Sequence, residues 1–111
     1  MPTLDLPERY LALLQALLEK YTPEAEVWAY GSRVSGESHA ASDLDIVLRN
    51  PIDLSQPQAQ LIDLKEAIDE SDIPILVDVH VWAGLPESFH AGIEERYVVI
   101  RENLGKVGFG V

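Results

Sequence analysis

Three aspartates in this chain occupy positions from which they can act together. Asp43 and Asp45 lie one residue apart at the start of the apolar run DLDIVL, and Asp78 lies inside a second run, PILVDVHVW. Side chains alternate between the two faces of a β-strand, so Asp43 and Asp45 share one face of the first run, and Asp78 shares a face with His80 in the second. If the two strands are neighbours, three carboxylates meet on one face of a sheet.

A group of carboxylates is unfavourable without a counter-charge, because like charges raise one another's pKa values and burial adds to the effect. A lone aspartate in a strand is usually a solvated residue or a strand-end cap, but aspartate is depleted in strands and three on one face weaken that reading. A divalent cation would relieve the repulsion. Oxygen ligands in a chain without cysteine favour Mg²⁺ or Mn²⁺ over zinc. His80 either lines this site or is a structural residue.

A glycine-containing turn, GSRVSGES, precedes the aspartates. Gly31 lets the backbone turn tightly and lets a ligand approach, and Ser32 offers a hydroxyl and a backbone N–H to an anion. The turn is not a P-loop, because Glu37 occupies the lysine position and a strand follows in place of a long helix. Dinucleotide-binding and serine-hydrolase motifs are absent as well. We therefore expect a phosphate-binding turn beside the metal ligands, in which Arg33 either contacts the phosphate or is solvated.

The surrounding sequence predicts the elements that must position these residues. Apolar residues at helical spacing predict helices, and short apolar runs predict strands. The predicted helices cover 7–21, 55–71 and 86–96, and a short helical turn is predicted to begin at Ser32. The predicted strands cover 26–30, 43–48, 74–82 and 97–100.

Several large apolar residues are expected in the core. Trp28 and Tyr30 are predicted to be core or sheet residues, and Trp82 is predicted to pack beneath the helix over 86–96. Within that helix, Phe89 and Ile93 have helical spacing and are assigned to the core.

Length and composition indicate one domain, 1–111, with a loosely held, glycine-rich tail over 104–111. The net charge of −11 disfavours binding to a nucleic-acid backbone or an anionic membrane, so phosphate is expected to bind through a metal. No apolar run is long enough to span a membrane, and neither a secretory signal nor a cysteine is present. These features predict a cytoplasmic protein.

The motifs together resemble a known family. The chain resembles the minimal nucleotidyltransferases, small members of the DNA polymerase β-like superfamily, whose signature is G-S-x10-D-x-D. It matches this signature with Gly31-Ser32, ten intervening residues and Asp43-x-Asp45. Asp78 falls on a later predicted strand, as the third aspartate does in that family. The resemblance implies an α+β fold (αβαβαβ) with a short mixed sheet and helices packed on one face. It implies that the three aspartates are catalytic and bind two Mg²⁺ ions, with Asp78 assisting deprotonation of the attacking hydroxyl, and that Gly31 and Ser32 hold the triphosphate of ATP.

The same resemblance implies a function. Minimal nucleotidyltransferases are commonly encoded beside a HEPN-domain ribonuclease toxin and act as its antitoxin, some by transferring AMP to a tyrosine of the toxin. We therefore expect metal-dependent transfer of AMP from ATP to a hydroxyl, with a HEPN-domain protein as partner. Two alternatives stay open. One is a catalytically idle module that inhibits its partner by occlusion, and the other is a transferase for a small-molecule acceptor. Retention of three unfavourable carboxylates on one face favours activity.

Overall fold

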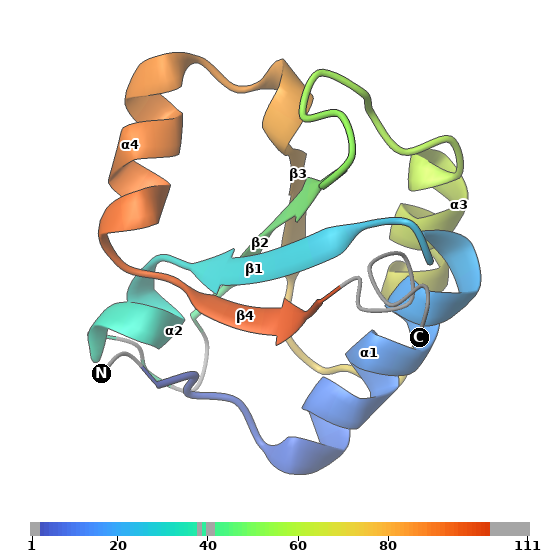
Figure 1. Ribbon diagram of the computed structural model, residues 1–111. Helices are drawn as coiled ribbons and strands as arrows, with labels where there is room; N and C mark the ends of the chain where they lie inside the picture. Colours follow the sequence, from blue (N-terminus) through green and yellow to red (C-terminus); the bar gives the residue numbers. More distant parts are fainter. Residues whose placement is uncertain (1–2, 38, 40–41, 103–111) are drawn as a thin grey trace, which may run out of the picture.

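The computed structural model describes residues 3–37, 39 and 42–102, and the expected flexible tail over 104–111 lies outside them. Helices and strands follow one another in the predicted order (Figure 1). The elements are α1 (Glu8–Tyr21), β1 (Glu26–Tyr30), α2 (Ser32–Ser35), β2 (Leu44–Arg49), α3 (Leu61–Asp69), β3 (Val77–Val81), a short 3-10 helix η1 (Trp82–Gly84), α4 (Glu87–Glu95) and β4 (Val98–Arg101). The predicted α+β fold with a mixed sheet is confirmed.

The four strands form one sheet in the order β3-β2-β1-β4. β1 runs antiparallel to both β2 and β4, whereas β2 and β3 are parallel. A parallel pair needs a long crossover, and the segment containing α3 provides it. The two strands that carry the aspartates are therefore neighbours, which is the condition on which the predicted site depends.

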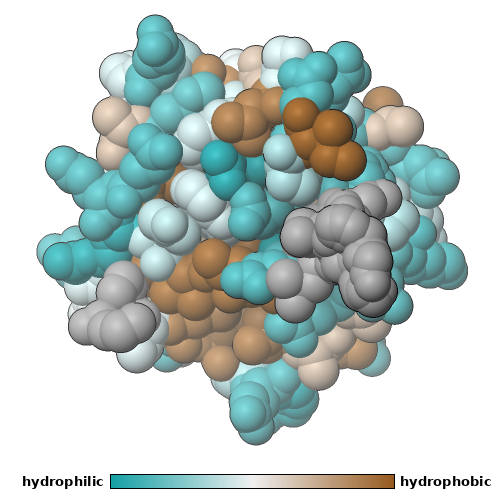
Figure 2. Space-filling view, viewed as in Figure 1, coloured by the Kyte–Doolittle hydropathy of each residue, from teal (hydrophilic) through white to brown (hydrophobic). Residues whose placement is uncertain are grey.

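One face of the sheet is aliphatic and packs against α1 and α3. Leu14 and Leu18 on α1, and Leu64 and Ile68 on α3, are four residues apart and buried, so each helix presents one apolar face to the sheet. The strands contribute alternating residues to the same core, namely Val27, Ala29, Leu44, Ile46, Leu48, Val77 and Val79. Apolar side chains reach the surface below β4, between α2 and α1 (Figure 2). Among the described residues, no helix is long and apolar enough to cross a membrane.

The opposite face of the sheet carries the second core, and α4 packs there. Ile93 of α4 packs with Trp28, Val47 and Trp82, so the helices are divided between the two faces, with α1 and α3 on one and α4 on the other. The expectation that the helices pack on one face of the sheet is therefore wrong for α4. Trp82 lies beneath α4 as predicted, with the His90 ring stacked on it at 3.9 Å between centroids. The His90 Nε2 atom is also 2.7 Å from the Trp82 carbonyl oxygen.

Arg49 organises this second core. Its guanidinium lies 4.0 Å from the Trp28 ring centroid and 4.5 Å from that of Trp82, and it pairs with the Glu26 carboxylate at 2.5 Å. Such a desolvated cation over an aromatic ring contributes roughly 2 kcal/mol. Trp28 stacks on Tyr97 as well, at 3.8 Å between centroids. We refer to these residues as the aromatic cluster: Trp28, Arg49, Trp82, His90 and Tyr97.

Candidate active site

The sheet register brings Asp45 and Asp78 together. They are direct partners on the parallel strands β2 and β3, and His80 lies two residues further along β3 on the same face. One ligand atom from each of these three residues lies within 4.8 Å of the others. Two carboxylates and one imidazole at such short range fit a divalent cation, with the oxygens suiting Mg²⁺ and the added nitrogen compatible with Mn²⁺.

The electrostatics of this face show what a cation would relieve. Burial raises the pKa of Asp45, and the Asp78 carboxylate raises it further, while His80 acts in the opposite direction. Tyr30 lies directly across from Asp45 on β1. Burial, together with the Asp45 and Asp78 carboxylates, raises the pKa of Tyr30 to about 12. The face therefore has a negative potential that opposes any further negative charge unless a positive charge is bound.

Gly31 joins the turn to the carboxylates. Its backbone has φ 85° and ψ −155°, a region that is essentially restricted to glycine. A Cβ atom added at this position would lie 2.5 Å from the Asp45 Oδ2 atom. The absence of a side chain therefore allows both the sharp turn after β1 and the placement of the Asp45 carboxylate against it.

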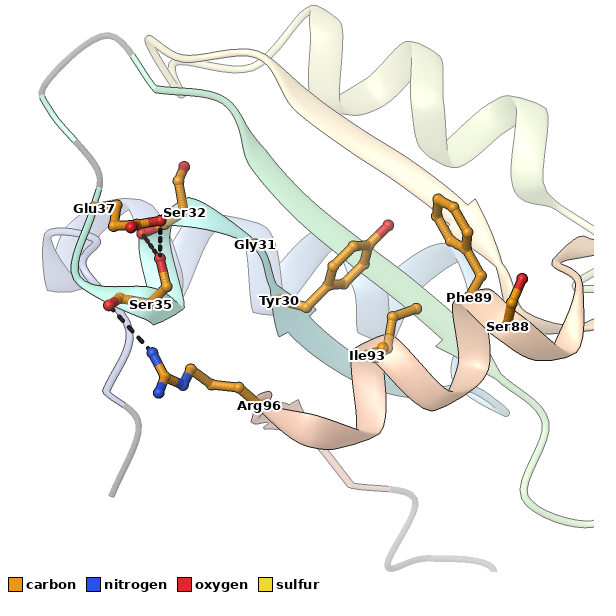
Figure 3. A pocket seen from close by; sticks show the side chains of 10 residues that line it. Tyr30, Gly31, Ser32, Ser35, Glu37, Ser88, Phe89, Ile93 and Arg96 are labelled. Atoms are coloured by element: carbon orange, nitrogen blue, oxygen red, sulfur yellow. Dashed lines mark hydrogen bonds between the residues drawn. The ribbon is translucent and has the colours of Figure 1, made fainter.

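A cavity of about 530 Å³ begins at this turn. It lies between the segment that follows β1 and one side of α4, and Figure 3 shows the side chains that surround it. The volume is within the range of small-molecule and cofactor sites. The lining residues are Tyr30, Gly31, Ser32, Ser35, Glu37, Ser88, Phe89, Gly92, Ile93 and Arg96. Because Tyr30 and Gly31 also adjoin Asp45, the cavity and the three-residue ligand group are parts of one site.

The structure places two other predicted residues differently. Asp43 lies just before β2 and is exposed; it raises the pKa of Asp45 slightly but is outside the group of three close ligands. Arg33 is buried, and its guanidinium donates to the backbone carbonyls of Ser42 at 3.0 Å and Asp5 at 2.6 Å. These bonds connect α2 to Ser42, just before β2, and to the N-terminal segment at Asp5. Metal binding by Asp43 and phosphate contact by Arg33 stay predictions.

Two residues at the cavity did not stand out in the sequence. Phe89 was assigned to the core, but 48% of it is exposed at the cavity. Arg96 follows α4 and donates from Nη1 to the Ser35 carbonyl oxygen at 3.3 Å, which connects the end of α4 to α2. The only signal in the sequence was that Phe89 and Arg96 are seven residues apart, a spacing that places two residues on the same side of a helix.

Comparison with known proteins agrees with this geometry. A profile of the nucleotidyltransferase domain family matches residues 12–101. A protein of Haemophilus influenzae described as "Probable protein adenylyltransferase MntA" is 41% identical over 101 residues, which cover 89% of this chain and 85% of that protein. The matched region contains the turn, the paired aspartates and α4. The chain therefore belongs to the nucleotidyltransferase domain family, and its enzymatic class is that of a nucleotidyltransferase.

Proposed function

We propose that this nucleotidyltransferase moves AMP from ATP to a hydroxyl of a partner protein. The observation that carries the proposal is the contact between the two halves of the site, because the glycine of the phosphate-binding turn lies against the Asp45 carboxylate. A triphosphate at Gly31 and Ser32 would thus lie beside the proposed metal ligands. The description of the Haemophilus influenzae relative as a probable protein adenylyltransferase supports AMP as the transferred group and a protein as the acceptor.

Each residue of the site has a defined role in this proposal. Asp45 and Asp78 hold Mg²⁺, with Asp43 as the further predicted ligand and His80 beside them. When bound there, Mg²⁺ would supply positive charge to offset the negative charge that develops on the phosphate oxygens during transfer. The Ser32 hydroxyl donates to the triphosphate, and the exposed Asp78 carboxylate assists in accepting the proton of the acceptor hydroxyl. That oxygen bonds to the α-phosphorus while the bond to the pyrophosphate oxygen breaks.

The proposed acceptor is a tyrosine of a HEPN-type ribonuclease toxin, so that the chain acts as a cytoplasmic antitoxin. The resemblance to the minimal nucleotidyltransferases motivates this partner. Two features of the molecule support it. Asp78 is exposed on β3, an edge strand of the sheet, so a bulky acceptor can approach it. The net charge of −11 complements the basic surface with which a ribonuclease binds RNA.

The test is transfer of label from α-³²P-ATP to the proposed HEPN-domain partner, in the presence of Mg²⁺. Wild-type protein should label the partner, and a double variant carrying Asp45→Asn and Asp78→Asn should not. A control variant with Asp63→Asn and Asp69→Asn removes the same charge from the exposed side of α3 and should retain transfer. If the site variant labels the partner as well as the wild type, the proposed site is wrong. If it loses transfer but still neutralises the toxin, inhibition occurs by occlusion.

A further inference from the structure

One side of α4 forms a continuous wall of the cavity. The wall consists of residues whose spacing places them on the same side of the helix: Ser88, Phe89, Gly92 and Ile93, with Arg96 just beyond its end. The wall faces the turn that contains Gly31 and Ser32 across the cavity. None of the α4 residues is needed to hold a metal, so the wall is available to recognise the rest of a ligand.

The two ends of this wall differ in chemistry (Figure 3). At one end, the Tyr30 and Phe89 rings line the cavity, together with Ser88. Phe89 is 48% exposed, whereas the other α4 residue in the same stripe, Ile93, is 3% exposed and belongs to the second core. An open position at Gly92, where an added Cβ would meet nothing within 4 Å, leaves room beside the Phe89 ring for a flat group.

The other end of the wall is polar and carries Arg96. Within the part of the cavity lining that the structure describes, Arg96 is the only cationic side chain. Ser32 and Ser35 lie at the same end, as Figure 3 shows. Glu37 is there too and accepts a hydrogen bond from the Ser35 hydroxyl at 3.4 Å. Arg96 therefore offsets the one carboxylate at this end, in a molecule whose net charge is −11.

We propose that the nucleoside triphosphate lies along α4, with its base stacked on Phe89 and its β- and γ-phosphates at Arg96. This inference rests on the proposed function and adds to it the residues that fix the direction of the nucleotide. Phe89 and Arg96 are seven residues apart, which is about 10 Å along a helix. Gly31 lines the cavity and the Asp45 carboxylate lies against Gly31, so we place the α-phosphorus at this point for attack.

The chemistry of each end suits its assigned group. An aromatic ring stacks on any base, because every base has a π-face, so Phe89 would secure the base without selecting strongly among bases. A guanidinium offers paired N–H donors that match phosphate oxygens. Asp45 lies against Gly31 and is the direct sheet partner of Asp78, so we place the α-phosphate near these two residues, and Arg96 would hold the phosphates that leave as pyrophosphate.

Two probes separate the two ends: α,β-methylene-ATP, which has a base, and inorganic tripolyphosphate, which has none. Their affinities are measured by calorimetry in the presence of Mg²⁺. Phe89→Ala should weaken binding of the ATP analogue roughly 5-fold to 150-fold and leave tripolyphosphate binding unchanged. Phe89→Tyr keeps the ring and should restore binding of the analogue. Arg96→Gln should weaken binding of both probes by the same factor, roughly 10-fold to 100-fold.

Two controls make the same chemical changes away from the cavity. Ile62→Ala removes an exposed apolar side chain from α3, and Arg9→Gln removes an exposed arginine from α1; both should bind the probes as the wild type does. The inference is overturned if Phe89→Ala affects both probes equally, or if Arg96→Gln leaves tripolyphosphate binding intact. A wild-type protein that binds neither probe would refute the proposed function as well. Normal binding by the wild type and by both site variants would refute this inference alone.

Discussion

Replacing Gly31 with alanine tests the contact between the proposed phosphate-binding turn and the proposed metal ligands. The added Cβ atom would lie 2.5 Å from Asp45 Oδ2 and 3.4 Å from Asp45 Cγ. Since ordinary contacts begin at about 3.4 Å, the Cβ and the carboxylate oxygen must separate by about 1 Å. Either the Asp45 side chain turns away from Asp78 or the backbone of the turn moves.

Both stability and metal binding should respond. The backbone at Gly31 is in a region that disfavours side chains, and this alone should lower the free energy of unfolding by about 1–3 kcal/mol. Displacement of a carboxylate by about 1 Å should reduce AMP transfer on the order of 100-fold. Urea denaturation measures the first effect, and calorimetry with Mn²⁺, together with the transfer assay, measures the second.

Gly36→Ala is the matched control. Gly36 also has a positive φ, 88°, but an added Cβ would meet nothing within 4 Å, so we expect a loss of about 1–2 kcal/mol with Mn²⁺ binding retained. In an Asp45→Ala background, where the collision is gone, Gly31→Ala should destabilise less than it does in the wild type. Equal destabilisation in the two backgrounds, or wild-type Mn²⁺ affinity in Gly31→Ala, would refute the reasoning.

Three further outcomes follow from the same geometry. In EDTA at pH 7, Asp45→Asn should unfold at a temperature a few degrees higher than the wild type, because it removes a partly buried negative charge and the repulsion of that charge by Asp78, an effect that solvent screens to below about 1 kcal/mol. Since the pKa of Asp45 is raised, the difference should disappear as the pH falls through that pKa. Arg33→Met should lower the free energy of unfolding by roughly 2–4 kcal/mol in urea denaturation, because it leaves partly buried carbonyls without their charged donor. The pKa of Tyr30 is about 12 and its ordinary value is 10.0, so between these pH values the unfolded chain loses the tyrosine proton before the folded protein does. The wild type should therefore lose stability relative to Tyr30→Phe as the pH rises from 10 to 12, and equal pH profiles for the two proteins would contradict this.

Alternation of side chains in strands predicted which aspartates share a face, on the condition that the two strands are neighbours. It placed Asp45 and Asp78 on one face, and both do face the same side of the sheet on β2 and β3. The alternation rule holds only within a strand. Asp43 precedes the first residue of β2 and is outside the close group, while His80, which the sequence left undecided, is within it. The strand register decides that His80 and not Asp43 joins the close group. The register depends on the packing of the whole sheet and cannot be predicted from the local spacing of residues.

The environments of Phe89 and Arg33 could not be predicted for a related reason. Helical spacing shows that Phe89 and Ile93 share a side of α4, but only the position of α4 over the sheet decides which of them is covered. An arginine in a turn is usually exposed, so the burial of Arg33 could not be predicted without knowing that three segments of the chain meet around it.

The aromatic cluster gives this protein an intrinsic optical probe. Trp28 and Trp82 are the only two tryptophans in the chain, and their rings are held 5.6 Å apart at 76°. Two indoles in fixed proximity absorb ultraviolet light as a coupled pair, which circular dichroism detects. Because His90 of α4 stacks directly on Trp82, any displacement of α4 during nucleotide or partner binding would alter that spectrum without an attached dye. The packing that holds the second core together therefore also makes motion of α4 visible in the unlabelled molecule.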